Sequence, residues 1–170
     1  TRQLSPRDQA RLKQILTLKY GYVANQGFCR RGAHRRIFDD APPIRRPDTT
    51  WYHPVIENLS STTIPKNVGA VLLTAAEERV LFLQFNYCRY MVCKLKEQLR
   101  EGQITADQAR PILKWDRTAE VYRDQIAQTN LALVLAMAKR TRMSEVDFSD
   151  LVSEGNMALL RAVDKFDVAR

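Results

Sequence analysis

The sequence predicts an all-α protein, an irregular helical bundle of five or six helices with a partly irregular, basic N-terminal segment. Apolar residues recur at helical spacing through most of residues 71–170. Signals for helix starts precede these stretches, and six of the seven prolines lie before residue 70. We therefore expect two parts: residues 1–70, with one helix and long loops, and residues 71–170, a helical domain.

The composition is that of a globular chain whose positive charge is concentrated near its start. Hydrophobic residues make up 45% of the 170 residues and charged residues 27%. The formal net charge is +8, and residues 1–70 hold 12 Lys and Arg against 5 Asp and Glu. This excess favours nucleic acid or another polyanion as a neighbour, although solubility alone explains it equally well.

Neither a secreted protein nor a membrane protein is expected. The cysteines, Cys29, Cys88 and Cys93, are odd in number and no secretory segment is visible, which argues against a disulfide scaffold. No apolar run approaches the roughly 20 residues that a membrane-spanning helix needs. We expect a cytoplasmic protein with no membrane partner.

The first helix is predicted from Pro6 to about Tyr20. Ser5 can cap this helix, Pro6 suits its first turn, and Asp8 completes the start signal. Apolar residues follow at helical spacing, and Gly21 is placed to end the helix.

Residues 22–70 show no sustained period, and their most distinctive feature is a set of paired arginines. Two pairs, five residues apart, could bind phosphate by charge and bidentate hydrogen bonds: Arg30, Arg31, Arg35 and Arg36. A solvated, flexible arm is the alternative. Further on, Trp51 and Tyr52 could stack on a base or could pin a long loop to the helical body.

A capping box at Thr74 and Glu77 opens a long helix that we expect to end before Gly102. Its apolar stripe consists of Leu81, Phe85, Cys88 and Val92. The basic residues outside the stripe are expected to form a solvated face: Arg79, Arg89, Lys94, Lys96 and Arg100. Another helix starts at Thr105, and Pro111, beyond its first turn, should kink or restart it.

The last stretch, from Ile126 to Arg170, contains two helices separated by a charged break at Arg142–Asp147. Ser149 can cap the second helix. Its apolar positions are Leu151, Val152, Leu159, Ala162, Val163 and Phe166. Gly155 lies in mid-helix, which costs about 1 kcal/mol relative to Ala, so we expect the close approach of a neighbouring helix to offset it.

This stretch resembles the second conserved region of the sigma-70 family, the promoter-specificity subunits of bacterial RNA polymerase. The likeness rests on Asn130, Leu131, Leu133 and Val134, on residues 138–140, and above all on the blocks 150–156 and 162–167. A weaker likeness extends back to Leu72, Leu73, Thr74, Glu77 and Glu78, so that it covers roughly residues 70–170. Residues 1–70 carry no such likeness.

The resemblance implies that the last helix docks on the clamp helices of the largest catalytic subunit of RNA polymerase core. The positions that match the family's docking residues are Asp150, Ser153, Glu154, Asn156 and Leu160. Ser153 departs from the family, which often has a longer amide there. Promoter DNA is implied as a partner within the holoenzyme. Because the chain stops before the family's promoter-reading segment, we expect it to be an N-terminal fragment of a longer sigma factor.

Two other functions fit the same residues. A non-sigma regulator could occupy the clamp without directing initiation, and a basic helical module could bind nucleic acid without polymerase. The sequence contains no phosphate-binding Gly-rich loop and no G-x-S-x-G motif, so no enzyme, cofactor or small-molecule substrate is expected. The spacings of Cys29, His34, Cys88 and Cys93 do not fit a zinc site, so no metal is expected either.

Overall fold

The computed structural model describes residues 4–45, 72–99, 104–141 and 146–167. Within these ranges the chain forms five α-helices and one short π-helix, and no strand. The expected all-α fold is thereby confirmed. The boundary predicted at residue 70, and the residues Trp51 and Tyr52, lie outside the described residues. The predictions made for them therefore stay predictions.

Helix α1 (Pro6–Thr17) begins as expected, because the Ser5 hydroxyl accepts a hydrogen bond from the backbone N–H of Asp8 at 3.2 Å. The predicted end at Tyr20 is wrong. The chain turns into extended backbone at Leu18, three residues before Gly21. The Lys96 ammonium donates to the carbonyl of Ile15 at 3.1 Å. It satisfies one of the carbonyls that the helix end leaves free.

The segment after α1 packs on α3 (Ala75–Glu97), although its sequence shows no period. Phe28 and Ala33 are buried against Tyr87 of α3. Gly32 has a φ of 72° in the left-handed region, which only glycine adopts without strain. The short π-helix η1 (Arg35–Asp39) follows directly. Apolar periodicity does not predict η1, because five residues are too few to show a period.

The start and the core-facing stripe of α3 are confirmed. Thr74 and Glu77 form the capping box, and Leu81, Phe85, Cys88 and Val92 are all buried. The expected solvated basic face is wrong for Arg89 and Lys96. The Arg89 side chain is only 14% exposed because it pairs with Asp164, and Lys96 is occupied at the end of α1. Arg100 lies outside the described residues.

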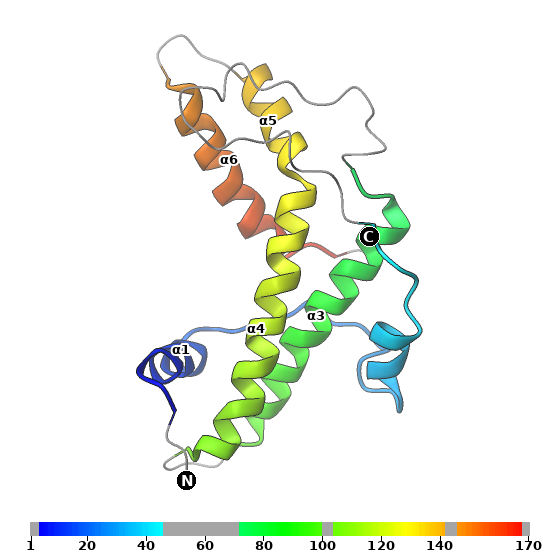
Figure 1. Cartoon of the computed structure of the whole chain (residues 1–170), viewed down its shortest axis with the longest axis vertical. Helices are drawn as coiled ribbons and strands as arrows, with labels where there is room; N and C mark the ends of the chain where they lie inside the picture. The colour runs from blue at the N-terminus through cyan, green and yellow to red at the C-terminus, as the bar shows by residue number, and fades with distance from the viewer. Residues whose placement is uncertain (1–3, 46–71, 100–103, 142–145, 168–170) are drawn as a thin grey trace.

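Helix α4 (Ala106–Thr129) starts with a capping box between Thr105 and Gln108. Of the kink or restart expected at Pro111, the restart does not occur, because the helix runs through this residue without interruption. Pro111 is exposed, whereas Ile112 and Leu113 beside it are buried against α1 and α3. Water can therefore solvate the carbonyl that loses its partner, while apolar packing holds the helix together. Figure 1 shows α3 and α4 as a long antiparallel pair.

Helices α5 (Leu131–Arg140) and α6 (Phe148–Val163) form a second antiparallel pair at the far end of α4 (Figure 1). The cap predicted at Ser149 is wrong, because the Asp147 carboxylate accepts the Ser149 backbone N–H at 2.8 Å. The Ser149 hydroxyl donates to the same carboxylate at 2.8 Å, and the two hydrogen bonds lower the pKa of Asp147. The earlier start places Phe148 inside the helix, where it packs against the core between α5 and α6.

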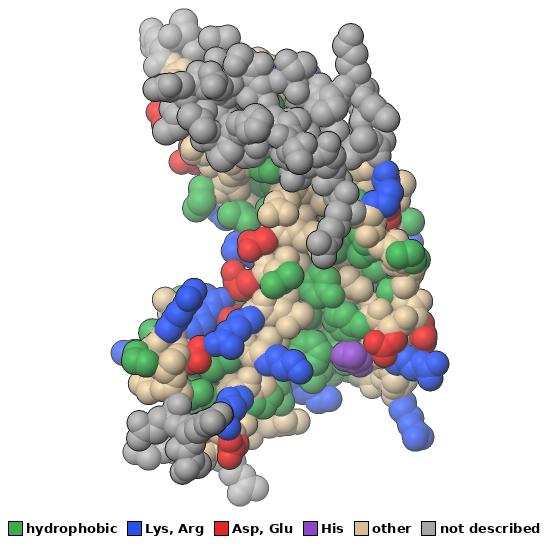
Figure 2. Space-filling view, in the orientation of Figure 1, with side chains coloured by type: hydrophobic (Ala, Val, Ile, Leu, Met, Phe, Trp, Pro, Cys, Tyr) green, Lys and Arg blue, Asp and Glu red, His purple; other side chains and the backbone are tan. Residues whose placement is uncertain are grey.

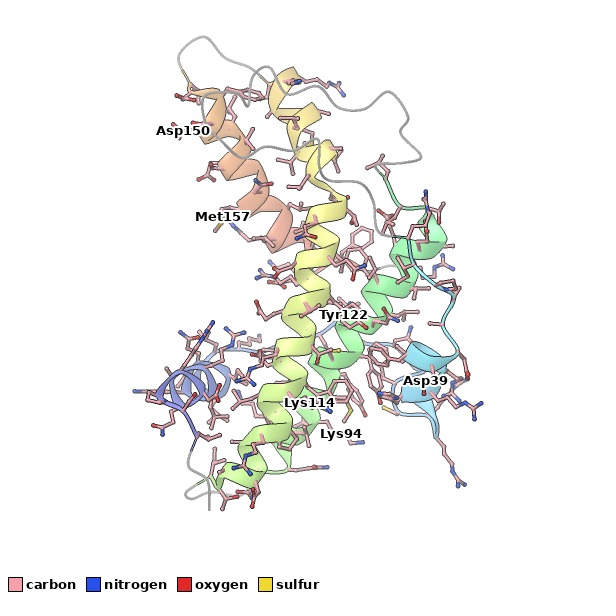
Figure 3. All side chains as sticks on the ribbon, viewed as in Figure 1. Asp39, Lys94, Lys114, Tyr122, Asp150 and Met157 are labelled. Atoms are coloured by element: carbon pink, nitrogen blue, oxygen red, sulfur yellow. The ribbon has the colours of Figure 1, made fainter. Side chains whose placement is uncertain are left out.

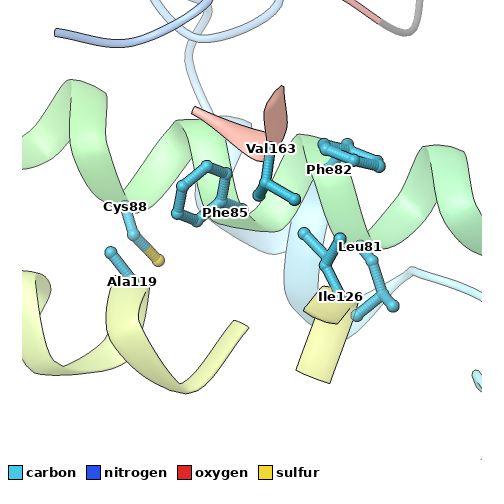
Figure 4. Packing of buried hydrophobic residues seen from close by; sticks show 7 residues of the cluster. All are labelled: Leu81, Phe82, Phe85, Cys88, Ala119, Ile126 and Val163. Atoms are coloured by element: carbon cyan, nitrogen blue, oxygen red, sulfur yellow. The ribbon is translucent and has the colours of Figure 1, made fainter. Parts of the chain in front are cut away.

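The central core joins α3, α4 and the end of α6. Figure 4 shows Phe85 and Cys88 of α3 near Ala119 of α4, with Val163 of α6 close by. Phe166, predicted on the last helix, lies beyond its end and packs against Phe82 with ring centroids 4.7 Å apart. Ala162, predicted to face the core, is exposed. The end of α6 and the residues just beyond it thus join this helix to the central core.

Candidate protein-docking surface

The outer side of α6 carries the residues that the sequence predicts for docking. Asp150, Ser153 and Glu154 are exposed, whereas Asn156 and Leu160 are half-buried. Figure 3 shows Asp150 and Met157 on the side of α6 that points away from α5. Met157 is 51% exposed and was not among the predicted residues. The α-helical spacing therefore gathers three polar side chains on one surface, which we call the outer face of α6, with a large apolar side chain next to them.

Neither carboxylate of the outer face has a partner within the described part of the chain. No basic side chain there lies within 4.0 Å of Asp150 or Glu154. Both acids remain available to positive charges on another molecule. Because they project from a helix and not from a loop, their spacing is fixed before any partner binds.

An apolar groove of about 380 Å³ lies beside this surface, between α5 and α6. It is lined by Leu133, Val134, Met137, Ala138, Thr141, Leu151, Gly155, Ala158, Leu159 and Ala162. Leu133 and Met137 on its α5 edge are 49% and 58% exposed. An apolar area next to polar residues is typical of interaction surfaces.

Gly155 explains how α5 and α6 come so close. A Cβ atom at this position would lie 2.7 Å from Cγ1 of Val134 on α5. This distance is far below van der Waals contact, so the side of α6 facing α5 admits no side chain at that point. The close approach that the sequence predicts for Gly155 is confirmed.

Replacing Gly155 with alanine is expected to destabilise the chain by up to about 2 kcal/mol. Overpacking costs about 1–3 kcal/mol, and the better helix propensity of alanine offsets about 1 kcal/mol of that. Val134 cannot easily rotate away because it is β-branched. Chemical unfolding measures the change. In a Val134→Ala background the same substitution should be neutral or stabilising; an equal cost in both backgrounds would contradict the close contact.

The end of α6 is fixed by a partly buried charge cluster that sequence reasoning missed. The Asp164 carboxylate accepts from Arg89 of α3 at 2.6 Å and from Arg123 of α4 at 3.3 Å. Arg123 also donates to the carbonyl of Leu160 at 3.3 Å. The three helices are thus tied at one point. Asp164 belongs to a sequence block that we used only for family likeness, and no local signal identifies its partners.

The four arginines predicted to contact nucleic acid lie far from α6. Arg30, Arg31, Arg35 and Arg36 are all exposed, on and before η1, which packs against α3. Arg35 pairs with Asp40 at 3.4 Å, and Arg36 donates to the carbonyl of Arg31. Figure 1 shows η1 and α6 at different ends of the molecule. The two predicted sets therefore form separate surfaces.

The described residues offer no site for a metal. No three His, Cys, Asp or Glu side chains converge within these parts of the chain. Cys88 is fully buried on α3, and burial raises the pKa of its thiol to about 12. Cys29 is exposed and lies 3.5 Å from the hydroxyl of Tyr90. No helix in the described ranges has the length and apolar character needed to cross a membrane.

Comparison with known families gives a match over the end of the chain, where α5 and α6 lie. Residues 126–170 match the family model of sigma-70 region 2. This range contains α5, α6 and Asp164, whereas Arg89 and Arg123, the partners of Asp164, lie before it. The part of the likeness that we extended back from residue 125 to residue 70 lies outside this range. Comparison with solved structures gives no significant match.

Similar curated proteins are named RNA polymerase sigma factors. The SigA factor of Lactococcus lactis subsp. cremoris is 42% identical over 77 residues, which are 43% of this chain and 21% of the relative. SigA of Listeria monocytogenes is 39% identical over 74 residues, 43% of this chain and 20% of the relative. RpoD of Helicobacter pylori is 34% identical over 74 residues, 44% of this chain and 9% of the relative. The chain thus matches about a fifth of the two SigA proteins and a smaller share of RpoD.

Proposed function

We propose that this chain takes part in promoter-specific transcription initiation by docking on RNA polymerase core. The proposal proceeds from the match of residues 126–170 to sigma-70 region 2. The docking surface in this proposal is the outer face of α6, and its partner is the pair of clamp helices of the largest catalytic subunit. The observation that carries the proposal is the exposure of Asp150, Ser153 and Glu154 in the block that resembles the family most.

The chemistry of the surface supports a basic protein partner. Asp150 and Glu154 lie one helical turn apart and are free of basic neighbours among the described residues. Two fixed carboxylates at this spacing can each receive a lysine or arginine from a facing helix. Met157 and the partly exposed Leu160 supply apolar contact area on the same helix. Asn156 is half-buried, and we propose that it forms a hydrogen bond with the partner at the edge of the outer face of α6.

Replacing Glu154 with lysine is expected to weaken binding to an isolated clamp-helix fragment by about 2 kcal/mol or more, roughly 30-fold in Kd. The substitution places a positive charge against the basic side of the partner. The melting temperature should stay near that of the parent, because Glu154 is exposed and unpaired. Titration calorimetry and thermal melts measure the two effects side by side.

A matched control is Glu97→Lys, which makes the same charge change at the exposed end of α3. This control should bind like the parent. If Glu154→Lys and Asp150→Lys also bind like the parent while folded, docking through the outer face of α6 is wrong. If Glu97→Lys loses as much affinity, the effect is one of net charge and not of this surface.

A regulator that occupies the clamp without directing initiation would use the same face, so clamp binding alone does not separate it from a sigma subunit. Initiation from promoter DNA in a reconstituted holoenzyme does separate the two. We keep Arg30, Arg31, Arg35 and Arg36 as proposed contacts to DNA phosphates. Their support is exposure and charge: no carboxylate of the described residues lies within 4.0 Å of Arg30, Arg31 or Arg36.

A further inference from the structure

Five aromatic side chains meet between η1, α3 and α4, away from the docking surface. We call them the aromatic seam: His34, Phe38, Tyr87, Trp115 and Tyr122. The His34 ring lies 4.9 Å from Phe38 and 6.0 Å from Trp115, measured between ring centroids. Phe38 lies 6.3 Å from Trp115 and 6.0 Å from Tyr122. The seam is continuous and links residues that are up to 88 positions apart, His34 and Tyr122.

The seam is buried at one side and open to solvent at the other. Tyr87 is 6% exposed and anchors the seam to α3. Phe38, Trp115 and Tyr122 are half-buried, and the His34 side chain is 55% exposed. Figure 2 shows green hydrophobic side chains reaching the surface over α4 and η1. A flat ring at His34, supported from behind by Phe38 and Trp115, is thus presented to the solvent.

Exposed lysines and arginines lie on the elements that form the seam. Lys94 and Lys114 are exposed, and Figure 3 labels both between the lower part of α4 and η1. The neighbouring cations are Arg30, Arg31, Arg35 and Arg36. Two carboxylates oppose them. Asp40 is paired with Arg35, and Asp39 lies 4.0 Å from His34. Residues 30–40 alone carry these four arginines against two acids, so the side of the seam formed by η1 has an excess of positive charge.

We propose that the aromatic seam and its cations bind single-stranded DNA, with one base stacked on His34 and the flanking phosphates on Lys114 and the η1 arginines. Stacking on aromatic rings within a basic surface is how proteins hold unpaired strands. The bases of a duplex present no free face to such a ring. The choice of DNA over RNA rests on the proposed function at promoters. The seam itself lies outside the residues matched by the sigma-70 family model.

The experiment titrates the chain with an oligothymidine strand and follows tryptophan fluorescence. The chain has two tryptophans, so a Trp51→Phe background makes Trp115 the single fluorophore. Binding should quench Trp115, because a base stacked on His34 changes the surroundings of the indole ring, whose centroid is 6.0 Å from that of His34. Affinity should fall with salt because phosphate contacts release counterions. A duplex of the same length and an oligouridine strand should bind more weakly.

His34→Ala should lower the affinity about fivefold or more, whereas His34→Phe, which keeps a flat ring, should retain it. Lys114→Ala should weaken binding because it removes a proposed phosphate contact, whereas the matched control Lys13→Ala, at an exposed position of α1, should bind like the parent. Absence of quenching, equal binding of His34→Ala, or tighter binding of RNA or duplex would overturn the proposal. No polymerase is present, so this failure is distinct from a failure of clamp docking.

Discussion

Replacing Asp164 with alanine should lower the free energy of unfolding by about 3 kcal/mol, the low end of the cost of breaking a buried ion pair. The substitution removes the shared acceptor of two guanidinium groups. Arg89 and Arg123 are 14% and 27% exposed, and the Nε atom of each is already buried without a partner. Without Asp164 two positive charges would face each other in a poorly solvated space. Asp164 is itself about a third exposed, which limits the loss.

Urea unfolding at neutral pH measures this change. Asp164→Asn should fall between parent and alanine variant, because the amide oxygen still accepts one hydrogen bond but carries no charge. Asp124→Ala removes an exposed acid of α4 and should change stability by less than about 0.5 kcal/mol. A loss below about 1 kcal/mol for Asp164→Ala would show that the cluster does not hold α6 to α3 and α4.

Replacing Arg11 with alanine should destabilise the chain by about 2–3 kcal/mol, because it leaves a buried carboxylate without its charge partner. Asp116 on α4 is 1% exposed and accepts two hydrogen bonds from Arg11 of α1, at 2.7 and 3.0 Å. The Tyr20 hydroxyl would remain as a donor at 3.1 Å. Burial and the Asp116 charge raise the pKa of Tyr20, so this hydroxyl keeps its proton. Arg11 is itself 38% exposed, and water can partly replace it.

The double variant Arg11→Ala with Asp116→Leu should recover at least half of the loss, since no charge is then left in the interior. Additive losses would contradict this account.

Local sequence rules determined much of the fold. The caps at Ser5, Thr74 and Thr105 depend on side chains within three residues of the backbone groups that they bind. The buried stripe of α3 follows from helical period alone. The close approach at Gly155 was also predicted, because an uncompensated mid-helix glycine is unfavourable. The exposure of Asp150, Ser153 and Glu154 agrees with their position opposite the apolar side of the same helix.

Where two local signals competed, only the packed structure decided. Asp147 and Ser149 can both cap a helix, and packing of Phe148 in the core between α5 and α6 favours the earlier start. Pro111 interrupts the hydrogen bonding of a helix, yet the packing of Ile112 and Leu113 against α1 and α3 keeps α4 continuous. Gly21 is a good helix end, but Lys96 from α3 satisfies the end of α1 before that point is reached.

The charge clusters and the aromatic seam lay beyond any local rule. Asp164 and Arg89 are 75 residues apart, and Arg11 and Asp116 are 105 residues apart. Each of these side chains has the polar or charged character of an exposed helix position, so its burial cannot be inferred from period or composition. Spacing along a helix fixes which side chains share a face. Only the approach of another helix removes such a face from water. A charged side chain on that face then loses its solvation and must be paired.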